Sequence, residues 1–396
     1  MTFVFWLSTV LIVYIYVGYP LCLWLLVKFQ SPAPLPVAKE CNNIAAAFQP
    51  SVVVLIAAYN EASVIRENIE NKLAQDYPSD KMRIIVISDE SDDGTDDIVK
   101  DYADRQVVLL RQSPRQGKTS GLNLAINWLQ QQNDNSEIIV FADANSIYAE
   151  HTISKLVESF QDQTVGYVTG KMIYVNADGS IAGDGCSAYM KYENMMRAQE
   201  TLIGSVVGVD GGVDAMRRTL HSQLNADQLP DFVQPLKVVE QGYRVAYEPE
   251  AILKEESLDD PEREFKMRVR VGLRALWALH DMRQLMNPKR FGLFGWQLIS
   301  HKLLRYLAFI PLLLVFISSV ILFNSATVYT IALAIQVVFY LLAWRAHQKN
   351  TIANASELRW YYALPYYFTL LNVACALALT KYLKGEKMVI WKPRSG

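Results

Sequence analysis

The sequence has few cysteines, no large excess of either charge and no internal repeat. Its four cysteines lack the spacing of a metal site, a redox motif or a disulfide framework, so they are interpreted as structural thiols. The 38 Lys and Arg residues nearly balance the 40 Asp and Glu residues, which gives a net charge of −2 and does not indicate a nucleic-acid partner. Function therefore has to be sought in the distribution of the apolar residues and in the polar motifs.

The apolar residues, 51% of the 396-residue chain, are concentrated in segments near the two ends. Residues 3–27 carry no charge, and at about 1.5 Å per residue they are long enough to cross a hydrocarbon core about 30 Å thick. A cleaved signal peptide would need a basic start, a shorter apolar core and a small-residue cleavage site, none of which is present. The segment is therefore predicted to be a retained membrane anchor. Three further spans are predicted at 303–323, 327–344 and 360–380.

The segments between these spans complete a predicted domain order. The Pro-rich stretch after the anchor is interpreted as a linker. Residues 286–302 mix basic and aromatic side chains as interfacial helices do, although a plain connector is the alternative. The predicted order is an anchor at 1–29, a linker at 30–47, a soluble domain at 48–285, an interfacial helix at 286–302, a bundle of spans at 303–384 and a tail at 385–396.

Within the soluble domain, short apolar runs alternate with helix-like segments. Strands are predicted at 51–57, 83–88, 107–111 and 137–142, with helices at 61–75, 94–104 and 117–131 between them. This alternation predicts an α/β fold with a mostly parallel sheet, and the uniformly apolar runs are typical of strands covered on both faces. Ligands of such sheets bind beyond the carboxyl ends of the strands, where the polar clusters of this sequence also lie.

The acidic cluster after the second strand contains one residue that stands apart. Asp89 follows the strand directly, where its carboxylate could accept hydrogen bonds from a base N–H or a ribose hydroxyl. The acids that come next are interpreted as turn and helix-capping residues, because Asp favours both positions. They are Asp92, Asp93, Asp96 and Asp97.

Three further motifs suggest a site for a charged ligand. The stretch "SPRQGKTSGLN" combines two cations with a glycine at a helix start, which is typical of an anion site, although a solvated basic loop is the alternative. Asp143 and Asn145 offer hard oxygens for Mg²⁺ or Mn²⁺ shared with a diphosphate, provided the strand bends there; a simple turn is the alternative. Asp231 begins a predicted helix, where it could equally be an N-cap.

In their order along the chain, these motifs resemble a membrane-bound family 2 glycosyltransferase with the GT-A fold, similar to bacterial polysaccharide synthases. No single motif is specific, whereas the ordered set is. It comprises "AAYNEASVI", "SDESDDGTDDIV", "RQGKTSGLNLAI", "FADANS", "GVDGGVDAMRR", "PDFVQPLKVVEQGYRVAYEPEA" and "EFKMRVRVG".

The resemblance implies roles for individual residues. It implies that a UDP-sugar donor is bound by Ala57, Tyr59, Glu61, Asp89, Lys118 and Asp143. It implies that Asp143 and Asn145 hold the Mg²⁺ or Mn²⁺ ion, and that Asp231 is the catalytic base. Contacts with the diphosphate or the acceptor are implied for Arg268, Arg270 and Asp210. The stretch "EFKMRVRVG" lacks the Trp that processive synthases carry there, which weakens the case for long processive polymerisation.

The resemblance implies hexosyl transfer with inversion, from a UDP-sugar to a glycan or lipid-linked acceptor in cell-surface or extracellular polysaccharide synthesis. Two alternatives are sugar transfer to a polyprenyl phosphate and an inactive nucleotide-sugar-binding subunit of a synthase. The expected partners are donor, acceptor, membrane lipid and export or synthase subunits. The expected location is the inner membrane, with the catalytic domain in the cytoplasm. Because three complete C-terminal spans would then put the basic tail outside, one span is expected to be interfacial or re-entrant, with the segment around Pro365 favoured.

Overall fold

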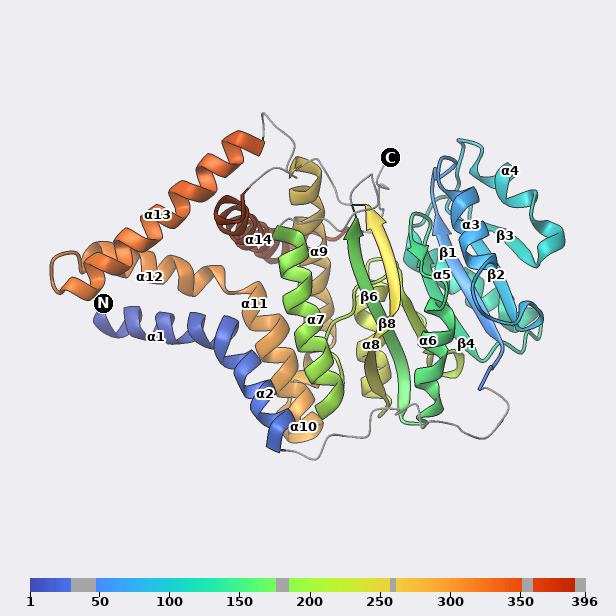
Figure 1. Ribbon diagram of the computed structural model, residues 1–396, viewed down its shortest axis with the longest axis horizontal. Coiled ribbons are helices and arrows are strands. Elements are labelled where there is room, and N and C mark those ends of the chain that lie inside the picture. Colours follow the sequence, from blue (N-terminus) through green and yellow to red (C-terminus); the bar gives the residue numbers. More distant parts are fainter. Residues whose placement is uncertain (30–47, 176–184, 257–260, 351–358, 389–396) are drawn as a thin grey trace. The chain divides into compact units, whose positions relative to one another are not determined.

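The computed structural model describes residues 1–29, 48–175, 185–256, 261–350 and 359–388 (Figure 1). The chain divides into two compact units. The helical unit comprises Met1–Gln30, Val175–Met196 and Glu256–Lys387. The sheet unit comprises Ser31–Tyr174, Arg197–Glu255 and Met388–Gly396. Of the residues predicted to belong to the soluble domain, the described stretches 185–196 and 261–285 cluster with the helical unit. The predicted domain boundaries stay a prediction.

The sheet unit is built on one eight-stranded sheet in the order β3-β2-β1-β4-β7-β6-β8-β5. The strands are β1 (Val52–Ala58), β2 (Met82–Ser88), β3 (Val107–Arg111), β4 (Ile138–Asp143), β5 (Ile147–Tyr148), β6 (Val165–Val175), β7 (Asp214–Arg217) and β8 (Arg244–Glu256). The pairs β1–β2, β1–β4 and β2–β3 are parallel, as the sequence predicts. The pairs β4–β7, β6–β7 and β5–β8 are antiparallel, so the sheet as a whole is mixed.

The parallel half forms where the sequence is most uniformly apolar. All seven residues of β1 are buried, and so are six of the seven in β2. Helices cover these strands, which explains the lack of polar alternation along them. The helices of this unit are α3 (Ile65–Leu73), α4 (Thr95–Lys100), α5 (Lys118–Gln131), α6 (Thr152–Glu158) and α8 (Pro230–Glu240), with the last part of α7 (Gly185–Ile203).

The register brings the ends of the parallel strands level with one another. Ala57 on β1 lies opposite Asp143 on β4, and the next residue, Ala58, lies opposite Ser88 on β2. Asp89 follows Ser88 at the same edge. The predicted convergence of strand-end side chains at one edge of the sheet is therefore confirmed for these two acids.

Among the described residues of the helical unit, three helices are long and apolar enough to cross a membrane: Thr2–Phe29, Thr327–Gln348 and Trp360–Leu383. The first joins α1 (Thr2–Val13) to α2 (Tyr19–Phe29) through a π-helical turn, Tyr14–Gly18, and the other two belong to α13 (Thr327–Asn350) and α14 (Trp360–Leu383). The remaining helices are the first part of α7, α9 (Pro261–Asp281), α10 (Pro288–Gln297), α11 (Leu304–Tyr306) and α12 (Phe309–Ile321). Phe5 of α1 packs with Val315 of α12 and Tyr329 of α13.

The expected irregular span lies elsewhere than near Pro365. Helix α14 contains Pro365 and continues through it. The bend occurs instead between Pro288–Tyr306 and Phe309–Ile321, which meet at 56°. With 13 residues, α12 is about 20 Å long and too short to cross a membrane alone. The predicted span at 303–323 is thus part of a bent pair, which forms either a broken span or a re-entrant loop.

Candidate active site at the carboxyl edge of the sheet

Three charged residues from different elements meet at the edge of the sheet unit. Asp143 is the last residue of β4, Lys118 is the first residue of α5, and Asp231 is the second residue of α8. The Lys118 ammonium donates to Asp143 Oδ1 at 2.8 Å and to Asp231 Oδ1 at 3.3 Å. Burial lowers the pKa of Lys118, but the two carboxylates outweigh it and raise that pKa above its ordinary value. Lys118 therefore stays cationic and offsets the repulsion between the two acids.

Asp231 is not the N-cap of its helix. Leu229 holds that position and makes no side-chain capping bond, while Pro230 is the first helical residue. The Asp231 carboxylate is turned to Lys118, and its place in the first turn of α8 suits a negative charge near a helix N-terminus. The capping interpretation of Asp231 is therefore wrong.

Two glycines lie against the two acids. Gly211 and Gly212 both have positive φ, at 77° and 74°, which favours glycine over other residues. A Cβ atom on Gly211 would lie 3.0 Å from the Asp231 carboxylate, and one on Gly212 would lie 3.3 Å from Asp143 Oδ2. In the "DGG" stretch, the absence of Cβ atoms thus lets the backbone lie close to the carboxylates of Asp231 and Asp143.

Asp89 holds the loop that leads into α5. Its carboxylate accepts from the backbone N–H of Gln116 at 2.9 Å and of Gly117 at 3.0 Å. It also pairs with Arg115 at 3.2 Å and accepts from the Gln112 side chain. Since Lys118 follows Gly117 directly, Asp89 fixes the start of the helix that carries Lys118.

Arg115 links Asp89 to another predicted donor-binding residue. Its guanidinium lies 3.3 Å from the centroid of the Tyr59 ring, at the end of β1. Ala57, two residues before Tyr59, is buried within β1. Arg115 was predicted only as one of two cations in its loop, without a role of its own, because the contact with a ring from another strand leaves no local signal in the sequence.

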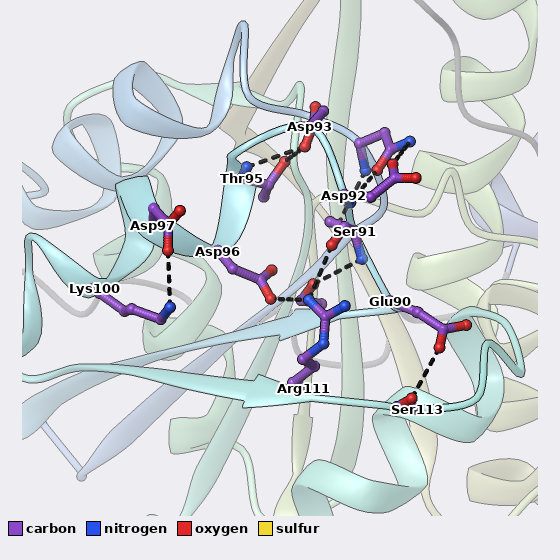
Figure 2. Close-up of polar contacts among 12 residues, drawn as sticks. Glu90, Ser91, Asp92, Asp93, Thr95, Asp96, Asp97, Lys100, Arg111 and Ser113 are labelled. Carbon is purple, nitrogen blue, oxygen red and sulfur yellow. Dashed lines mark hydrogen bonds and ion pairs between the residues drawn. The ribbon is translucent and has the colours of Figure 1, made fainter.

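The acids after Asp89 each make a polar contact within the sheet unit (Figure 2). The pairs are Asp92 with Asn60, Asp93 with Thr95, Asp96 with Arg111 and Asp97 with Lys100. Asp93 accepts from the Thr95 N–H at 3.0 Å and so supports the first turn of α4. Only the Asp93 contact is that of a helix-start residue, as the sequence predicts. Asp92 and Asp96 instead pair with Asn60 and Arg111 from other segments, and Asp97 forms an exposed ion pair with Lys100.

Two buried acids of the sheet unit have raised pKa values. Burial, with the charges of Asp143 and Asp93, raises the pKa of Glu61 to about 7. Burial also raises the pKa of Asp214 on β7 to about 8, and the charges of Asp231 and Asp210 add to the shift. Asp214 was missed by sequence reasoning because nothing in "GGVDAMRR" shows that it lies inside the sheet.

Two side chains of helix α3 donate hydrogen bonds to the turn that carries Asp143 and Asn145. Asn68 donates to the backbone carbonyls of Asp143 at 3.1 Å and Ser146 at 2.8 Å. The fully buried Lys72 also donates to the Ser146 carbonyl and lies 3.8 Å from the centroid of the Tyr148 ring. Neither residue stood out in the sequence, although their spacing of four residues on one helix face was a usable signal.

The remaining predicted site residues are placed in other surroundings. Asp210 forms a two-bond ion pair with Arg197, and both side chains are nearly buried. Arg268 lies on α9 in the helical unit, where it contacts Glu264 at 3.1 Å. Arg270 lies on the same helix, and burial lowers its pKa. Of the three residues expected to touch diphosphate or acceptor, only Asp210 belongs to the sheet unit.

The donor set at this edge suits a divalent ion that is shared with a substrate. Within the described ranges, no group of three His, Cys, Asp or Glu residues could hold a metal by itself. Asp143 ends β4 and Asn145 lies two residues further on; both are partly exposed, with the buried Ala144 between them. One carboxylate and one amide match Mg²⁺ or Mn²⁺ bound through few protein ligands and completed by phosphate oxygens. These residues therefore fit a metal–diphosphate, and fit a free ion poorly.

Together, the mixed sheet, its parallel half and the acids at its carboxyl edge define a glycosyltransferase fold of the GT-A type. The mannosyltransferase PcManGT from Pyrobaculum calidifontis, solved in complex with GDP-Man and Mn²⁺, has this fold. It is 21% identical, with a TM-score of 0.69, and the match covers 97% of this chain and 99% of that chain.

Residues 50–276 match the family described as "Glycosyltransferase like family 2", and the chain belongs to that family. A probable glycosyltransferase of Bacillus subtilis, YdaM, is 32% identical over 32% of this chain and 31% of that protein. A beta-monoglucosyldiacylglycerol synthase of Trichormus variabilis is 30% identical over 43% of this chain and 36% of that protein. A hyaluronan synthase of Streptococcus pyogenes is 26% identical over 42% and 40%. The matches thus span 31% to 40% of the length of these relatives.

Proposed function

We propose that the protein is an inverting hexosyltransferase that moves a sugar from a UDP-sugar to a glycan or lipid-linked acceptor at the membrane, in the synthesis of cell-surface or extracellular polysaccharide. The observation that carries the proposal is the junction of Asp143, Lys118 and Asp231 at the carboxyl edge of the sheet. It joins the motif expected to hold the metal–diphosphate to the acid expected to act as base. The names of the lipid glucosyltransferase and the hyaluronan synthase among the relatives fit either kind of acceptor.

The proposed reaction is a single displacement at the anomeric carbon. An acceptor hydroxyl oxygen forms the new bond to that carbon, the bond to the diphosphate oxygen breaks on the opposite face, and Asp231 takes the hydroxyl proton. Lys118 stays cationic and lies beside Asp143, so it can stabilise the negative charge that develops on the departing diphosphate. When bound by Asp143 and Asn145, Mg²⁺ or Mn²⁺ would act as a Lewis acid toward the diphosphate.

Replacement of Asp231 tests the proposed base. We expect Asp231→Asn to lower transfer about 10² to 10⁴-fold, the usual worth of general-base catalysis, with donor affinity nearly unchanged. The assay would use the purified full chain, labelled UDP-sugars and native lipid extract, with mass spectrometry of the product. Glu240→Gln, at the other end of α8, is the matched control. Near-normal turnover in Asp231→Asn would contradict the assignment of Asp231 as the general base.

Two variants at the strand-end turn test the metal. Asp143→Ala should abolish the dependence of donor binding on Mn²⁺, whereas Asn145→Asp should keep it and tighten the ion, because a second carboxylate adds a full negative ligand. Donor affinity measured against Mn²⁺ concentration checks both. Unchanged metal dependence in Asp143→Ala would show that the ion is held elsewhere. The same titration with GDP-sugars tests the choice of nucleotide.

The alternative of an inactive binding subunit is favoured only by Asn145, which makes the metal motif one charge weaker. The position of Asp231 beside Lys118 argues against it, since a subunit that only binds nucleotide has no need of a base there. The other alternative, transfer to a polyprenyl phosphate, differs in its product. Identification of the product released from native membranes separates the three possibilities.

The location that we propose is the bacterial inner membrane, crossed more than once, with the sheet unit in the cytoplasm where nucleotide sugars are made. Three helices of spanning length and Lys28 at the end of the first one support this orientation. Labelling of a single cysteine at Ser395 in intact cells tests the number of spans. Reaction with a membrane-impermeant reagent would place the tail outside and contradict an even number of crossings after the sheet unit.

A further inference from the structure

The ladder of paired residues between β4 and β7 stops short of the candidate active site. Its last pair is Phe141 with Asp214. Beyond this pair, β4 runs on to Asp143, whereas the chain that leads into β7 bends through Gly211 and Gly212, both with positive φ. This ladder therefore does not join the end of β4 to the glycine bend, as we call these two glycines, and their separation depends on other contacts.

The Tyr148 hydroxyl lies at the point where the ladder ends. Tyr148 is on β5 and is 3% exposed. Its hydroxyl lies 2.7 Å from the carbonyl oxygen of Gly212 and 3.1 Å from that of Phe141, and it donates to both. Burial raises the pKa of Tyr148 well above its ordinary value, and the charges of Asp214 and Asp143 add to the shift, so the hydroxyl keeps its proton. One hydroxyl thus joins the last paired residue of β4 to the glycine bend.

Other contacts hold the rest of Tyr148 in place. The Lys72 ammonium lies 3.8 Å from the centroid of its ring. The Asn71 side chain accepts from the Tyr148 N–H at 2.8 Å and donates to the Tyr148 carbonyl at 2.9 Å. None of these contacts involves the hydroxyl. Replacement of Tyr148 by phenylalanine therefore removes the link to the glycine bend and leaves the ring and the backbone with their partners.

The glycine bend in turn borders both acids of the candidate site. A Cβ atom on Gly212 would lie 3.3 Å from Asp143 Oδ2, and one on Gly211 would lie 3.0 Å from the Asp231 carboxylate. A shift of the bend therefore changes the space that is open to both carboxylates, which share Lys118 as their cation.

We propose that Tyr148 is a positioning residue whose hydroxyl sets the separation between the end of β4 and the glycine bend, and so keeps Asp143 and Asp231 in the arrangement that the reaction needs. The simpler alternative is a buried tyrosine whose hydrogen bonds only stabilise the fold. The effect on donor binding and transfer rests on the proposed function, whereas the effect on the glycine bend does not.

Tyr148→Phe tests the proposal, and Tyr77→Phe is its matched control. Tyr77 is another buried tyrosine of the sheet unit, and its hydroxyl donates to the carbonyl of Pro50, two residues before β1. Each variant loses a buried hydroxyl that donates to backbone carbonyl oxygen, so we expect similar losses of melting temperature. A difference between the two variants in any other measurement then reports on the place that Tyr148 occupies.

Hydrogen exchange tests the contact itself, on the purified full chain in detergent without metal or nucleotide. We expect the peptide that contains Gly211 and Gly212 to exchange about tenfold faster in Tyr148→Phe than in Tyr77→Phe, because the bend loses its bond to the tyrosine. A general loss of stability would speed exchange in both variants alike.

Donor binding and transfer test the consequence for the site. In Tyr148→Phe, the Mn²⁺ concentration at half-maximal UDP-sugar binding should rise about tenfold, as it does on loss of an outer contact around a metal site. The transfer rate at saturating donor and Mn²⁺ should fall about tenfold or more, because the Asp231 carboxylate is no longer confined to its position. Tyr77→Phe should leave both quantities at their wild-type values.

The outcomes separate this proposal from the proposed function. Equal exchange in the two variants would overturn the proposal. Faster exchange in Tyr148→Phe, with a wild-type Mn²⁺ midpoint and transfer rate, would also overturn it, because the hydroxyl would then serve the fold alone. A wild-type chain that binds no UDP-sugar would refute the proposed function, while the difference in exchange would still show that Tyr148 holds the glycine bend.

Discussion

The two units of this protein each contain a cluster of opposite charges, and the two clusters differ in exposure and in sign. At the edge of the sheet unit, two acids share one cation, and the Asp143 and Asp231 side chains are 42% and 25% exposed. In the helical unit, one acid, Glu193, lies within ion-pair distance of several basic groups, and its side chain is 2% exposed. An open cluster with an excess of acid can exchange its internal partner for a metal or a substrate. A buried acid among cations cannot do so without leaving charges unpaired.

This comparison implies that stability and activity depend on different clusters. Removal of an acid from the open cluster should affect the reaction, whereas removal of the buried acid should affect folding.

Glu193→Gln should destabilise the protein by about 3–5 kcal/mol, the usual cost of removing one partner from a buried ion pair. Its carboxylate holds the pairs with His301 and Arg305, and the charge of Arg305 keeps the pKa of Glu193 well below its ordinary value despite burial. Thermal unfolding in detergent measures the effect. Glu262→Gln removes an exposed acid from α9 and should change little. Equal stability of the two variants would contradict a structural role for the buried cluster.

Lys72→Met should weaken Mn²⁺-dependent donor binding about tenfold, as loss of an outer contact around a metal site does. Lys72 acts as a positioning residue, because it donates to the Ser146 carbonyl beside the turn that carries Asp143. The readout is the Mn²⁺ concentration at half-maximal donor binding, measured together with the melting temperature. Lys100→Met, at an exposed position, is the control. A lower melting temperature with an unchanged Mn²⁺ midpoint would assign Lys72 to stability alone.

Gly211→Ala should lower the transfer rate more than it lowers donor affinity. The added Cβ would lie 3.0 Å from the Asp231 carboxylate, at a φ that alanine rarely adopts, so the carboxylate has to move. Gly242→Ala has a similar φ but nothing within 4 Å, and it controls for backbone strain. Separate measurement of kcat and donor affinity checks the expectation. Equal losses of activity in the two variants would attribute the effect to strain.

Glu61→Gln should change the dependence of stability on pH. Because burial raises the pKa of Glu61 from 4.5 to about 7, the unfolded chain loses this proton at lower pH than the folded chain does. The wild type therefore loses stability as the pH rises from about 4.5 to about 7, and the neutral Gln does not. The melting temperature of the variant minus that of the wild type should rise through this window and stay level above it. A difference in melting temperature that does not change with pH would show that the pKa of the Glu61 carboxyl is not raised in the folded chain.

Local pattern was enough to locate the strands of the parallel half and the acids at their ends. Runs such as 137–142 are apolar throughout because both faces of the sheet are covered, and β4 indeed ends at Asp143. The antiparallel half was less accessible to this kind of reasoning. Strand β7 has four residues and joins β4 and β6 to complete the sheet, but a short run carries little periodic signal.

The sequence by itself determined the class of the fold, the apolar helices and the order of the motifs, because each depends on residues close together in the chain. Only the tertiary structure decided which side chains meet. Lys118 reaches Asp231 across 113 positions, and Glu193 reaches Arg305 across 112. Such contacts depend on how helices and strand ends are placed by the packing of the whole unit. No local pattern records that placement, so the pairing of Asp143 with Asp231 through Lys118 became visible only in the folded chain.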